Sequence, residues 1–445
     1  DTPFMDINLR YEQHNLGVKT YFDFSKQKGW LCAIEQCNGS GDCRKSNLFG
    51  GTMCPTYRAT REEKNTTRAR ANTLRELLIH PAHDRIFSQP EILEVLDTCV
   101  SCKACKSECP SNVDMARYKA EYLQHHYDET FVSLRSRLIA NLTKVQKLGM
   151  VAPWLYNAFV TAQFTSSLLK RILKFAPQRS IPRLYKITLK SWLYNNPDMN
   201  KCNRKVYLFA DEFTNYMDVE IGIKFIKLLR TLGYEVIIPK HLESGRTEIS
   251  KGLLKKAKKI AEKNILFLKD IVTEEIPLVG IEPSCILSFR DEYPDLVDEE
   301  LQGYARKLSV NCLLYDEFIV REMRKGNIKQ KQFTQSYLYI KLHGHCHQKS
   351  LASIEPSKEM LSLPKNYQVD IIPSGCCGMA GAFGYEKEHY DLSMQIGEQV
   401  LFPAIRQAKE DVCISAPGTS CRQQIKDGTG RRAYHPIEVL YDALI

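Results

Sequence analysis

Hydrophobic positions recur with a helical period through much of the first 200 residues. From Thr67 to Ile79, Leu74, Leu77 and Leu78 fall on one face, which predicts a helix. Between residues 128 and 200 the helical pattern continues without a cysteine, with apolar side chains every three or four residues: Phe131, Leu134, Leu138, Leu142 and Val145. Residues 1–29 have no clear period and are interpreted as a linker.

The period changes near residue 203, where short apolar runs alternate with helical stretches. The first part predicts these strands and helices: Lys205–Ala210, Tyr234–Ile238 and Ile276–Ile281, with Val219–Leu232 and Lys251–Glu262. The second part predicts these: strands Tyr337–Leu342, Val369–Ile372 and Asp411–Ser415, and a helix Leu392–Ala408. Such alternation predicts mostly parallel sheets covered by helices. The repeated order indicates two copies of about 110 to 120 residues.

The stretch from Leu148 to Phe175 is apolar and aromatic, with basic residues on both sides. One interpretation is a helix that lies on a membrane surface. The other, which we favour at this point, is a helix that packs on its own protein.

Composition places the chain among ordinary globular proteins. Of its 445 residues, 43% are hydrophobic and 26% are charged, which excludes disordered, collagen-like and low-complexity classes. No apolar run reaches about 18 residues, so a membrane-spanning helix is not expected. No signal peptide is expected either. Because the sequence opens on Asp1 rather than Met, we expect a piece of a longer protein.

The net charge of +10 raises the question of a nucleic-acid partner. The basic residues are spread along the chain, and no nucleic-acid motif is recognised. We therefore expect no nucleic-acid partner.

The 16 cysteines are clustered. Eight lie between Cys32 and Cys109, and four more form a second set: Cys346, Cys376, Cys377 and Cys421. Clustered cysteines in a long chain without a secretory signal indicate a metal protein of a reducing compartment. We expect a cytoplasmic protein, either free or peripheral on the inner face of the plasma membrane. Of the four remaining cysteines, three have no motif and are expected to be buried thiols: Cys202, Cys312 and Cys413. The fourth is Cys285.

The run Cys99-x2-Cys102-x2-Cys105-x3-Cys109-Pro110 is the most specific motif. Thiolates at this spacing bind a cubane iron–sulfur cluster, and the cysteine before proline serves a neighbouring cluster in two-cluster proteins. A zinc site would need two separated cysteine pairs and would not explain the terminal Cys-Pro.

A partner motif is present in altered form. Cys54-Pro55 supplies an exchanged cysteine, so the first predicted cluster has these ligands: Cys54, Cys99, Cys102 and Cys105. The second predicted cluster has three: Cys37, Cys43 and Cys109. Ser40 stands at its middle motif position. Its fourth position stays open between Cys32, the Ser40 oxygen, and a three-iron (3Fe-4S) instead of a 4Fe-4S cluster.

The second set has its own spacing. Cys346 precedes Cys376 by 29 intervening residues, and 43 residues separate Cys377 from Cys421. Adjacent cysteines flanked by glycines allow a tight turn in which both thiols face one metal site. The histidines around Cys346 are either ligands or, as we favour, hydrogen-bonded neighbours of the metal: His343, His345 and His347.

The first copy lacks the cysteine pair. Glu243-Ser244-Gly245-Arg246 stands in its place, and Cys285 alone remains, at the position that matches Cys421. We therefore expect metal in one copy only. Cys285 is a candidate fifth ligand if the two copies face each other.

These motifs together resemble a known family. The matching stretches are CNGSGDCRK from Cys37, TMCPTYRATREE from Thr52, SCKACKSECPSNVD from Ser101, HGHCHQK from His343, SGCCGMAGAFGY from Ser374 and APGTSCRQQI from Ala416. They are similar to the C-terminal iron–sulfur half of FAD-linked 2-hydroxy acid dehydrogenases, of the glycolate oxidase and D-lactate dehydrogenase type. The cysteine-rich repeats also resemble those of the heterodisulfide reductases and of the iron–sulfur protein of anaerobic glycerol-3-phosphate dehydrogenase.

The resemblance implies a function and a fold. The chain would be the electron-transfer portion of a flavin-dependent D-2-hydroxy acid dehydrogenase acting on D-lactate, glycolate or D-2-hydroxyglutarate. FAD would lie on a flavin domain in the same polypeptide or a partner chain, and no catalytic residue is expected here. Electrons would pass through two ferredoxin-type clusters and a third iron–sulfur centre at the paired cysteines to a quinone or cytochrome, with peripheral membrane contact as an option.

The expected fold class is α+α/β, a helical two-cluster ferredoxin-like domain followed by a duplicated α/β cysteine-rich domain. Its expected segments are a linker at 1–29, the ferredoxin-like domain at 30–127, a helical connector at 128–200, a degenerate repeat at 201–330 and a second repeat at 331–445. Two alternative functions remain: a heterodisulfide-type thiol–disulfide reductase, and a zinc-stabilised scaffold for other proteins of a complex.

Overall fold

A computed structural model describes residues 17–46, 48–81, 85–198 and 204–445. The expected linker is therefore described only from residue 17, and Cys202 lies outside the described residues. The N-terminal part is helical, as predicted. Its α-helices are α1 Trp30–Glu35, α2 Pro55–Thr60, α3 Thr67–Ile79, α4 Pro90–Asp97, α5 Ala104–Glu108 and α6 Met115–Glu129.

Helix α3 spans the residues that its pattern predicted. It begins after Thr66, whose side chain accepts a hydrogen bond from the Ala69 amide and so caps the helix. Leu74, Leu77 and Leu78 are buried on its inner face. This face packs on α1, α4 and α6.

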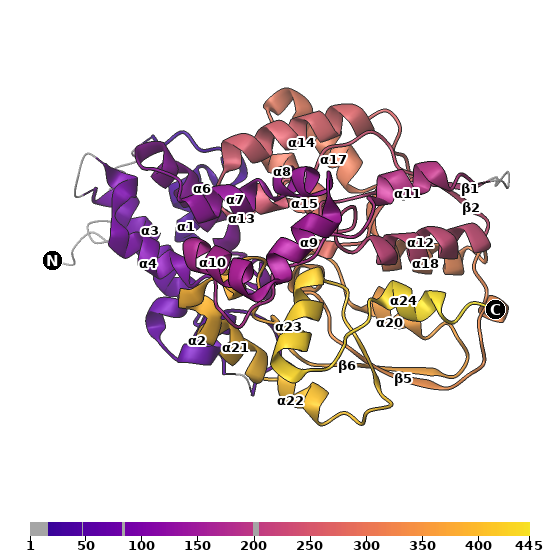
Figure 1. Ribbon diagram of the computed structural model, residues 1–445. Helices are drawn as coiled ribbons and strands as arrows, with labels where there is room; N and C mark the ends of the chain where they lie inside the picture. Colours follow the sequence, from indigo (N-terminus) through magenta and orange to yellow (C-terminus); the bar gives the residue numbers. More distant parts are fainter. Residues whose placement is uncertain (1–16, 47, 82–84, 199–203) are drawn as a thin grey trace.

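Five further helices connect this part to the sheets. They are α7 Leu134–Ala140, α8 Leu142–Gly149, α9 Pro153–Thr161, α10 Gln163–Leu173 and α11 Leu189–Asn195. The apolar stretch from Leu148 is therefore not one helix, because Pro153 starts α9 at the position where proline is favoured. In Figure 1 α9 and α10 lie at the front of the molecule, between the indigo N-terminal helices and the yellow C-terminal segment.

A four-stranded parallel sheet follows, with strand order β2-β1-β3-β4. Its strands are β1 Arg204–Phe209, β2 Tyr234–Ile237, β3 Leu278–Gly280 and β4 Cys312–Leu314. The helices that accompany it are α12 Val219–Thr231, α13 Arg246–Ser250, α14 Leu254–Leu268, α15 Pro283–Asp291, α16 Tyr293–Leu296, α17 Glu299–Ser309 and α18 Tyr315–Arg324. We call residues 204–324 the first lobe.

The second lobe, residues 338–441, holds a three-stranded parallel sheet with order β6-β5-β7. Its strands are β5 Leu338–Leu342, β6 Tyr367–Ile371 and β7 Cys413–Ser415. Its helices are α19 Cys346–Leu351, α20 Glu355–Leu361, α21 Tyr390–Glu398, α22 Leu401–Arg406, α23 Thr419–Thr429 and α24 Pro436–Tyr441. The two small parallel sheets confirm the α/β part of the expected fold class.

The predicted helix Leu392–Ala408 is two helices, α21 and α22. Pro403 lies in the first turn of α22, where its ring and missing N–H favour a helix start over a continuous helix. The two lobes share one hydrophobic core that includes Leu208 of β1, Ile340 of β5 and Ile437 of α24. They therefore pack as one body.

His389 ties the second lobe to the N-terminal helices. Its Nε2 lies 2.8 Å from an Asp97 carboxylate oxygen, and its Nδ1 lies 3.0 Å from Glu386. Burial by itself would lower the pKa of His389, but the hydrogen bonds with Asp97 and Glu386 outweigh it and raise this pKa to about 9. The imidazolium is thus stabilised by folding.

We predict that this ion-pair cluster makes stability depend on pH. A raised folded-state pKa gives stability that is fully present below the unfolded-state value of about 6.5 and is lost as the pH rises through about 9. The contribution is up to about 3 kcal/mol. Denaturant unfolding between pH 6.5 and 9 should show this loss in the native chain and a much flatter profile in His389→Gln. An equal slope in both proteins would contradict the prediction.

Candidate metal centres

Four cysteines from two distant segments line one cavity in the N-terminal part. They are the four assigned to the first cluster: Cys54, Cys99, Cys102 and Cys105. Thr67 and Met115, at the N-termini of α3 and α6, line the same cavity. Since helix N-termini carry free N–H groups and partial positive charge, they favour anionic sulfur in the space between them.

Backbone amides point at the sulfur atoms of this cavity. The Thr67 amide donates to Cys54 Sγ over 3.1 Å. The amides of Ala104 and Met115 donate to the Cys102 and Cys105 sulfurs. Such donors stabilise thiolates and the sulfurs of a bound cluster.

The backbone is strained where it wraps this cavity. Cys54 has φ +48°, and Ser101 and Lys103, which flank Cys102, have φ +49° and +62°. Non-glycine residues rarely adopt this left-handed conformation, and they keep it only where the surroundings enforce it. The strain is therefore concentrated on the turns that present the cysteines.

The other N-terminal cysteines gather beside the first four. The Cys37 sulfur lies close enough to Cys43 and Cys109 for their charges to affect its pKa. These are the three cysteines assigned to the second cluster. Cys43 also contacts Cys54, whose thiol hydrogen bond lowers the pKa of Cys43 to about 6. Cys54 thus lies between the two groups.

The open fourth position of the second cluster has two described candidates. Cys32 is exposed on α1. Ser40 is also exposed, and its hydroxyl lies within hydrogen-bond reach of the Asp42 carboxylate. Neither side chain is buried with Cys43 and Cys109.

Burial keeps protons on the free thiols of the first group. It raises the pKa of Cys102 well above its ordinary value, and that of Cys105 to about 12. Ligation by a metal deprotonates a thiol outright. The donor set, its N–H partners and the cavity therefore fit a metal cluster.

The second cysteine set converges because of the sheet topology. Cys346 follows the central strand β5, the pair Cys376-Cys377 follows β6, and Cys421 follows β7. Parallel strands bring their carboxyl ends to one edge, where open α/β sheets place their ligands. All four cysteines are buried, and their thiols form a chain of contacts from Cys346 through the pair to Cys421. We call this the paired-cysteine site.

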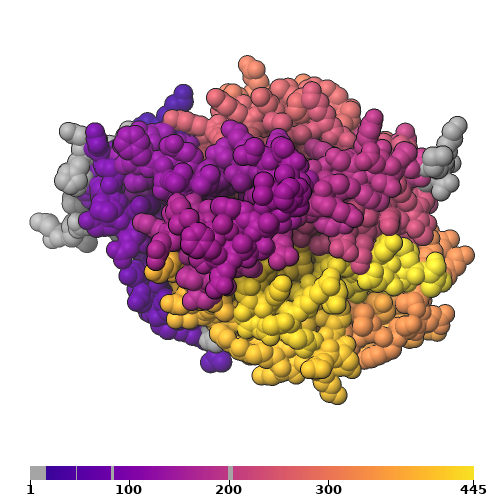
Figure 2. All heavy atoms as spheres, in the orientation of Figure 1, coloured from indigo at the N-terminus to yellow at the C-terminus, as the bar shows by residue number. Residues whose placement is uncertain are grey.

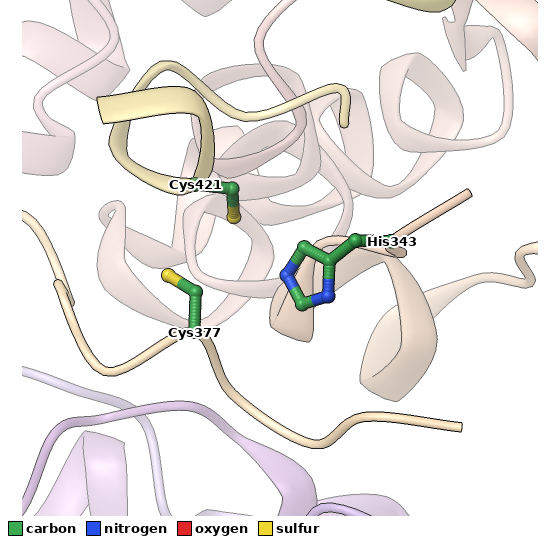
Figure 3. A group of neighbouring side chains, drawn as sticks. All are labelled: His343, Cys377 and Cys421. Carbon is green, nitrogen blue, oxygen red and sulfur yellow. The ribbon is translucent and has the colours of Figure 1, made fainter. Parts of the chain in front are cut away.

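His343 belongs to this site. One of its ring nitrogens and the sulfurs of Cys377 and Cys421 lie within 4.8 Å of one another, and Figure 3 shows the three side chains facing one another. Its Nδ1 is 2.7 Å from the Ser374 hydroxyl, while its buried Nε2 lacks a hydrogen-bond partner among the described residues. The expectation that it is only a hydrogen-bonded neighbour therefore leaves one ring nitrogen without a role, whereas a ligand role uses it.

Sequence reasoning missed Lys349. Its ammonium donates to the carbonyls of Ser374 and Gly375, directly before the cysteine pair, the second at 2.7 Å. This fixes the turn that presents Cys376 and places a positive charge beside the buried sulfurs. The sequence around Lys349 gives no sign of this role, because only the fold brings α19 against the end of β6.

Cys285, the candidate fifth ligand, lies in the first turn of α15. It is buried in the first lobe, and the groups that act on its pKa are Glu212, Asp211, Glu282 and Ser244. Ser244 stands where the first copy lacks its cysteine pair, and it donates to Glu212. The other expected buried thiols differ: Cys312 is buried and Cys413 is partly buried.

The two metal-binding regions adjoin. His347 Nε2 lies 3.0 Å from the Ser101 carbonyl oxygen, and the Ser350 hydroxyl donates to the Cys102 carbonyl over 3.2 Å. Cys346 lies close enough to Cys102 to affect its pKa. One hydrophobic core contains Cys54, Cys102, Cys346 and Cys376.

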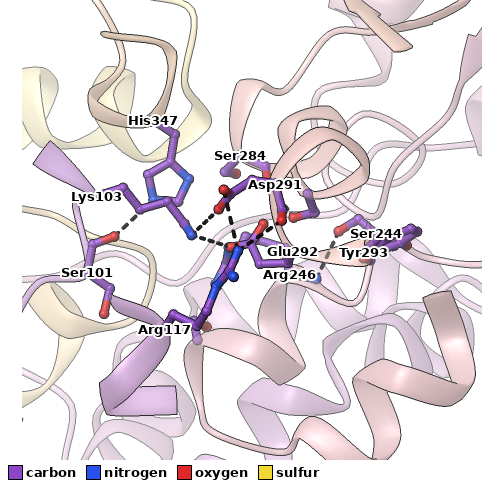
Figure 4. Close-up of polar contacts among 12 residues, drawn as sticks. Ser101, Lys103, Arg117, Ser244, Arg246, Ser284, Asp291, Glu292, Tyr293 and His347 are labelled. Atoms are coloured by element: carbon purple, nitrogen blue, oxygen red, sulfur yellow. Dashed lines mark hydrogen bonds and ion pairs between the residues drawn. The ribbon is translucent and has the colours of Figure 1, made fainter. Parts of the chain in front are cut away.

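Buried ion pairs anchor the cysteine loop to the first lobe. Lys103, between Cys102 and Cys105, contacts Asp291 and lies 2.8 Å from Glu292. Arg117 and Arg246 approach the same carboxylates. Figure 4 shows this network together with His347 on its other side. The loop is thereby held by the carboxylates of the first lobe and by His347 of the second lobe.

Comparison with known proteins agrees with these sites. Residues 33–113 match the 4Fe-4S dicluster domain family, and residues 340–426 match the cysteine-rich domain family. The D-2-hydroxyglutarate dehydrogenases of Pantoea ananatis and Escherichia coli strain K12 are each 25% identical over 93% of this chain. The chain fits the iron–sulfur half of the FAD-linked dehydrogenases.

The chain spans 44% of the length of those two relatives. It is also similar to one component of the anaerobic glycerol-3-phosphate dehydrogenase of Escherichia coli strain K12, with 27% identity over 72% of this chain and 79% of that component. The expected resemblance is confirmed at this level.

We predict that Gly378 is required for the turn after the cysteine pair. Its φ is +94°, and an added Cβ would lie 2.2 Å from the Ser393 carbonyl oxygen. Gly378→Ala should therefore lower the free energy of unfolding by at least about 2 kcal/mol. Gly381→Ala is the matched control, because Gly381 has φ +62° with open space around it. It should cost only about 1 kcal/mol. Equal losses in denaturant unfolding would contradict this account.

Proposed function

We propose that the chain conducts electrons within a flavin-dependent D-2-hydroxy acid dehydrogenase. The observation that carries this proposal is the continuity of the two cysteine regions, from Cys37 and Cys43 through the four-cysteine cavity to Cys346. FAD, on a flavin domain of the same polypeptide or of a partner chain, would supply the hydride chemistry when bound. Within the described residues, the buried cysteine sulfurs would bind the clusters through which electrons leave the flavin.

The ligand assignment keeps the crossed pattern of two-cluster proteins. Cys54 and the first three cysteines of the main motif would hold one cluster, and Cys109 would serve the other, with Cys37 and Cys43. The shared cavity supports the first assignment, and the mutual proximity of the three remaining cysteines supports the second. A 3Fe-4S form and a fourth ligand from Cys32 or Ser40 remain alternatives for the second cluster.

The paired-cysteine site would hold the third centre. Cys346, Cys376, Cys377 and Cys421 are its proposed ligands, with His343 as an addition from the fold. Both sheets are parallel, and β2-β1-β3 has the same order relative to the chain as β6-β5-β7. This likeness supports a duplicated cysteine-rich fold in which only the second lobe kept its metal ligands.

Zinc at the paired-cysteine site is a second candidate. A histidine nitrogen and two cysteine sulfurs within 4.8 Å of one another also suit tetrahedral zinc. In that case the paired-cysteine site would be structural, and electron transfer would end at the ferredoxin-type clusters. A thiol–disulfide reductase would instead turn over a disulfide substrate, which distinguishes it directly.

The proposed boundaries follow the sequence segments. A linker to residue 29 leads into the cluster-bearing domain at 30–127, the connector at 128–200 and the repeats at 201–330 and 331–445. The proposed acceptor is a quinone or a cytochrome. None of the described helices is both long and apolar enough to span a bilayer. The proposed contact with a membrane quinone pool is peripheral, on the inner face of the plasma membrane.

We predict that Cys109→Ser damages the cluster at Cys37 and Cys43 more than the cluster at Cys99, Cys102 and Cys105. The reason is the crossed ligation, in which the cysteine before proline serves the neighbouring site. EPR of the anaerobically purified, dithionite-reduced variant should show one intact four-iron signal. Selective loss of the cluster at Cys99, Cys102 and Cys105 would contradict this assignment.

We further predict that Cys377→Ala removes the third centre and leaves both ferredoxin-type clusters in place. Iron content should fall while the visible absorbance of the other clusters still bleaches with dithionite. Substrate should still reduce the flavin of the full-length protein, whereas acceptor reduction should fall at least roughly tenfold. Cys413→Ala, a cysteine outside the site, is the control. Zinc instead of iron in the native protein, with acceptor reduction unchanged in Cys377→Ala, would make the site structural.

A further inference from the structure

Basic residues are spread along the chain, but one segment lacks acidic residues to balance them. Residues 130–197 contain eleven Lys and Arg and no Asp or Glu, so they carry +11, whereas the whole chain carries +10. The rest of the chain therefore sums to −1. The segment contains α7 to α11. A long stretch with a single sign of charge favours a partner of the opposite sign.

The same segment also exposes most of the large apolar side chains. Nineteen large hydrophobic residues are exposed among the described residues, and eleven of them lie between Phe131 and Ile172. Trp154 is 74% exposed and Phe164 79%. On α10, Phe164, Leu168 and Ile172 follow at four-residue spacing and so form one stripe.

These side chains are exposed although their helices are firmly attached. The Gln146 side chain donates to the Glu212 carbonyl, and Asn157 exchanges hydrogen bonds with the backbone of Leu184. Val160 and Ser166 are buried as inward-facing positions. The apolar side chains therefore face outward as a consequence of the packing. The preference for a helix packed on its own protein holds for the inner face only.

We propose that α8, α9 and α10 lie on an anionic lipid surface. An apolar face rich in aromatic residues and bordered by Lys and Arg enters the headgroup region, while the basic groups meet lipid phosphates. The exposed basic residues of this stretch are Lys144 and Lys147 of α8, Arg171 of α10 and Lys174 directly after α10. The absence of acidic residues from the segment favours lipid over a protein partner of mixed charge. In Figure 2 this segment, in purple and magenta, forms part of the front of the molecule, above the yellow C-terminal part.

The end of this surface is bonded to the loop that follows the cysteine pair. Directly after α10, the Ala176 amide donates to the Tyr385 carbonyl over 2.7 Å, and the Lys387 amide donates to the Lys174 carbonyl. Arg179, which is buried, donates to the Gly384 carbonyl and pairs with Asp427. The stretch 376–385 begins with the cysteine pair. Lipid contact would therefore bring the paired-cysteine site toward the membrane. That consequence rests on the proposed function, whereas lipid binding does not.

The test measures binding of the full-length polypeptide to vesicles, by flotation. We expect binding to phosphatidylcholine vesicles that contain phosphatidylglycerol, weaker binding without it, and loss at high salt. Lys147→Glu with Arg171→Glu should weaken binding roughly tenfold or more. Lys259→Glu with Lys263→Glu, on the basic and exposed face of α14, is the matched control and should bind as the native protein does.

A second pair of variants tests the apolar face. Trp154→Ser, Phe159→Ser and Phe164→Ser combined should abolish flotation, because each side chain is already exposed and its loss spares the fold. The control combines Leu266→Ser, Val310→Ser and Tyr337→Ser, three exposed residues elsewhere. Trp154 emission should shift to the blue on vesicles, and Trp154→Phe should lack that shift.

Three outcomes overturn the proposal. They are equal binding by segment and control variants, binding that does not depend on anionic lipid, and Trp154 emission that is already blue without vesicles in a protein that does not float. The last would mean that protein, such as the flavin domain, covers the face. None of these readouts uses iron or electron transfer, so their failure is separate from failure of the proposed function.

Discussion

Buried thiols govern the design of this chain, because they need both a cation to deprotonate them and dipoles to hold the negative charge that results. The fold places cysteines where helix N-termini and strand ends meet. Thr67 and Met115 contribute amides at the four-cysteine cavity, and Lys349 contributes an ammonium at the paired-cysteine site. Without these donors, burial would favour neutral thiols and oppose metal binding. The loops that present these cysteines carry local backbone strain at Cys54, Ser101 and Lys103.

The two cysteine regions are joined through backbone as well as through sulfur. Helix α19 begins at Cys346, and its residues His347 and Ser350 bond to the carbonyls of the Ser101–Cys102 loop. A shift of either site would therefore disturb the other. This arrangement explains why residues from both regions share one hydrophobic core, although more than 200 residues separate them in sequence.

Local patterns predicted the local features well. The bounds of α3, the change to parallel α/β structure and the gathering of Cys54 with the main motif all follow from periodicity or spacing. Features that depend on tertiary contacts were not accessible. Lys349 reaches the carbonyls of another strand end, and Lys103 meets Asp291 across 188 residues.

The ion pairs between Lys103 and the first lobe limit how the cysteine motif from Cys99 to Cys109 can be changed or moved to another protein. Lys103, Asp291 and Glu292 are all nearly inaccessible to solvent. Removing one partner of such a set leaves an uncompensated buried charge, which costs about 3 to 5 kcal/mol. Natural drift at position 103 would therefore require matched substitutions at 291 or 292. A designer who grafts the cysteine motif onto another carrier would have to transplant this acidic receptor surface with it.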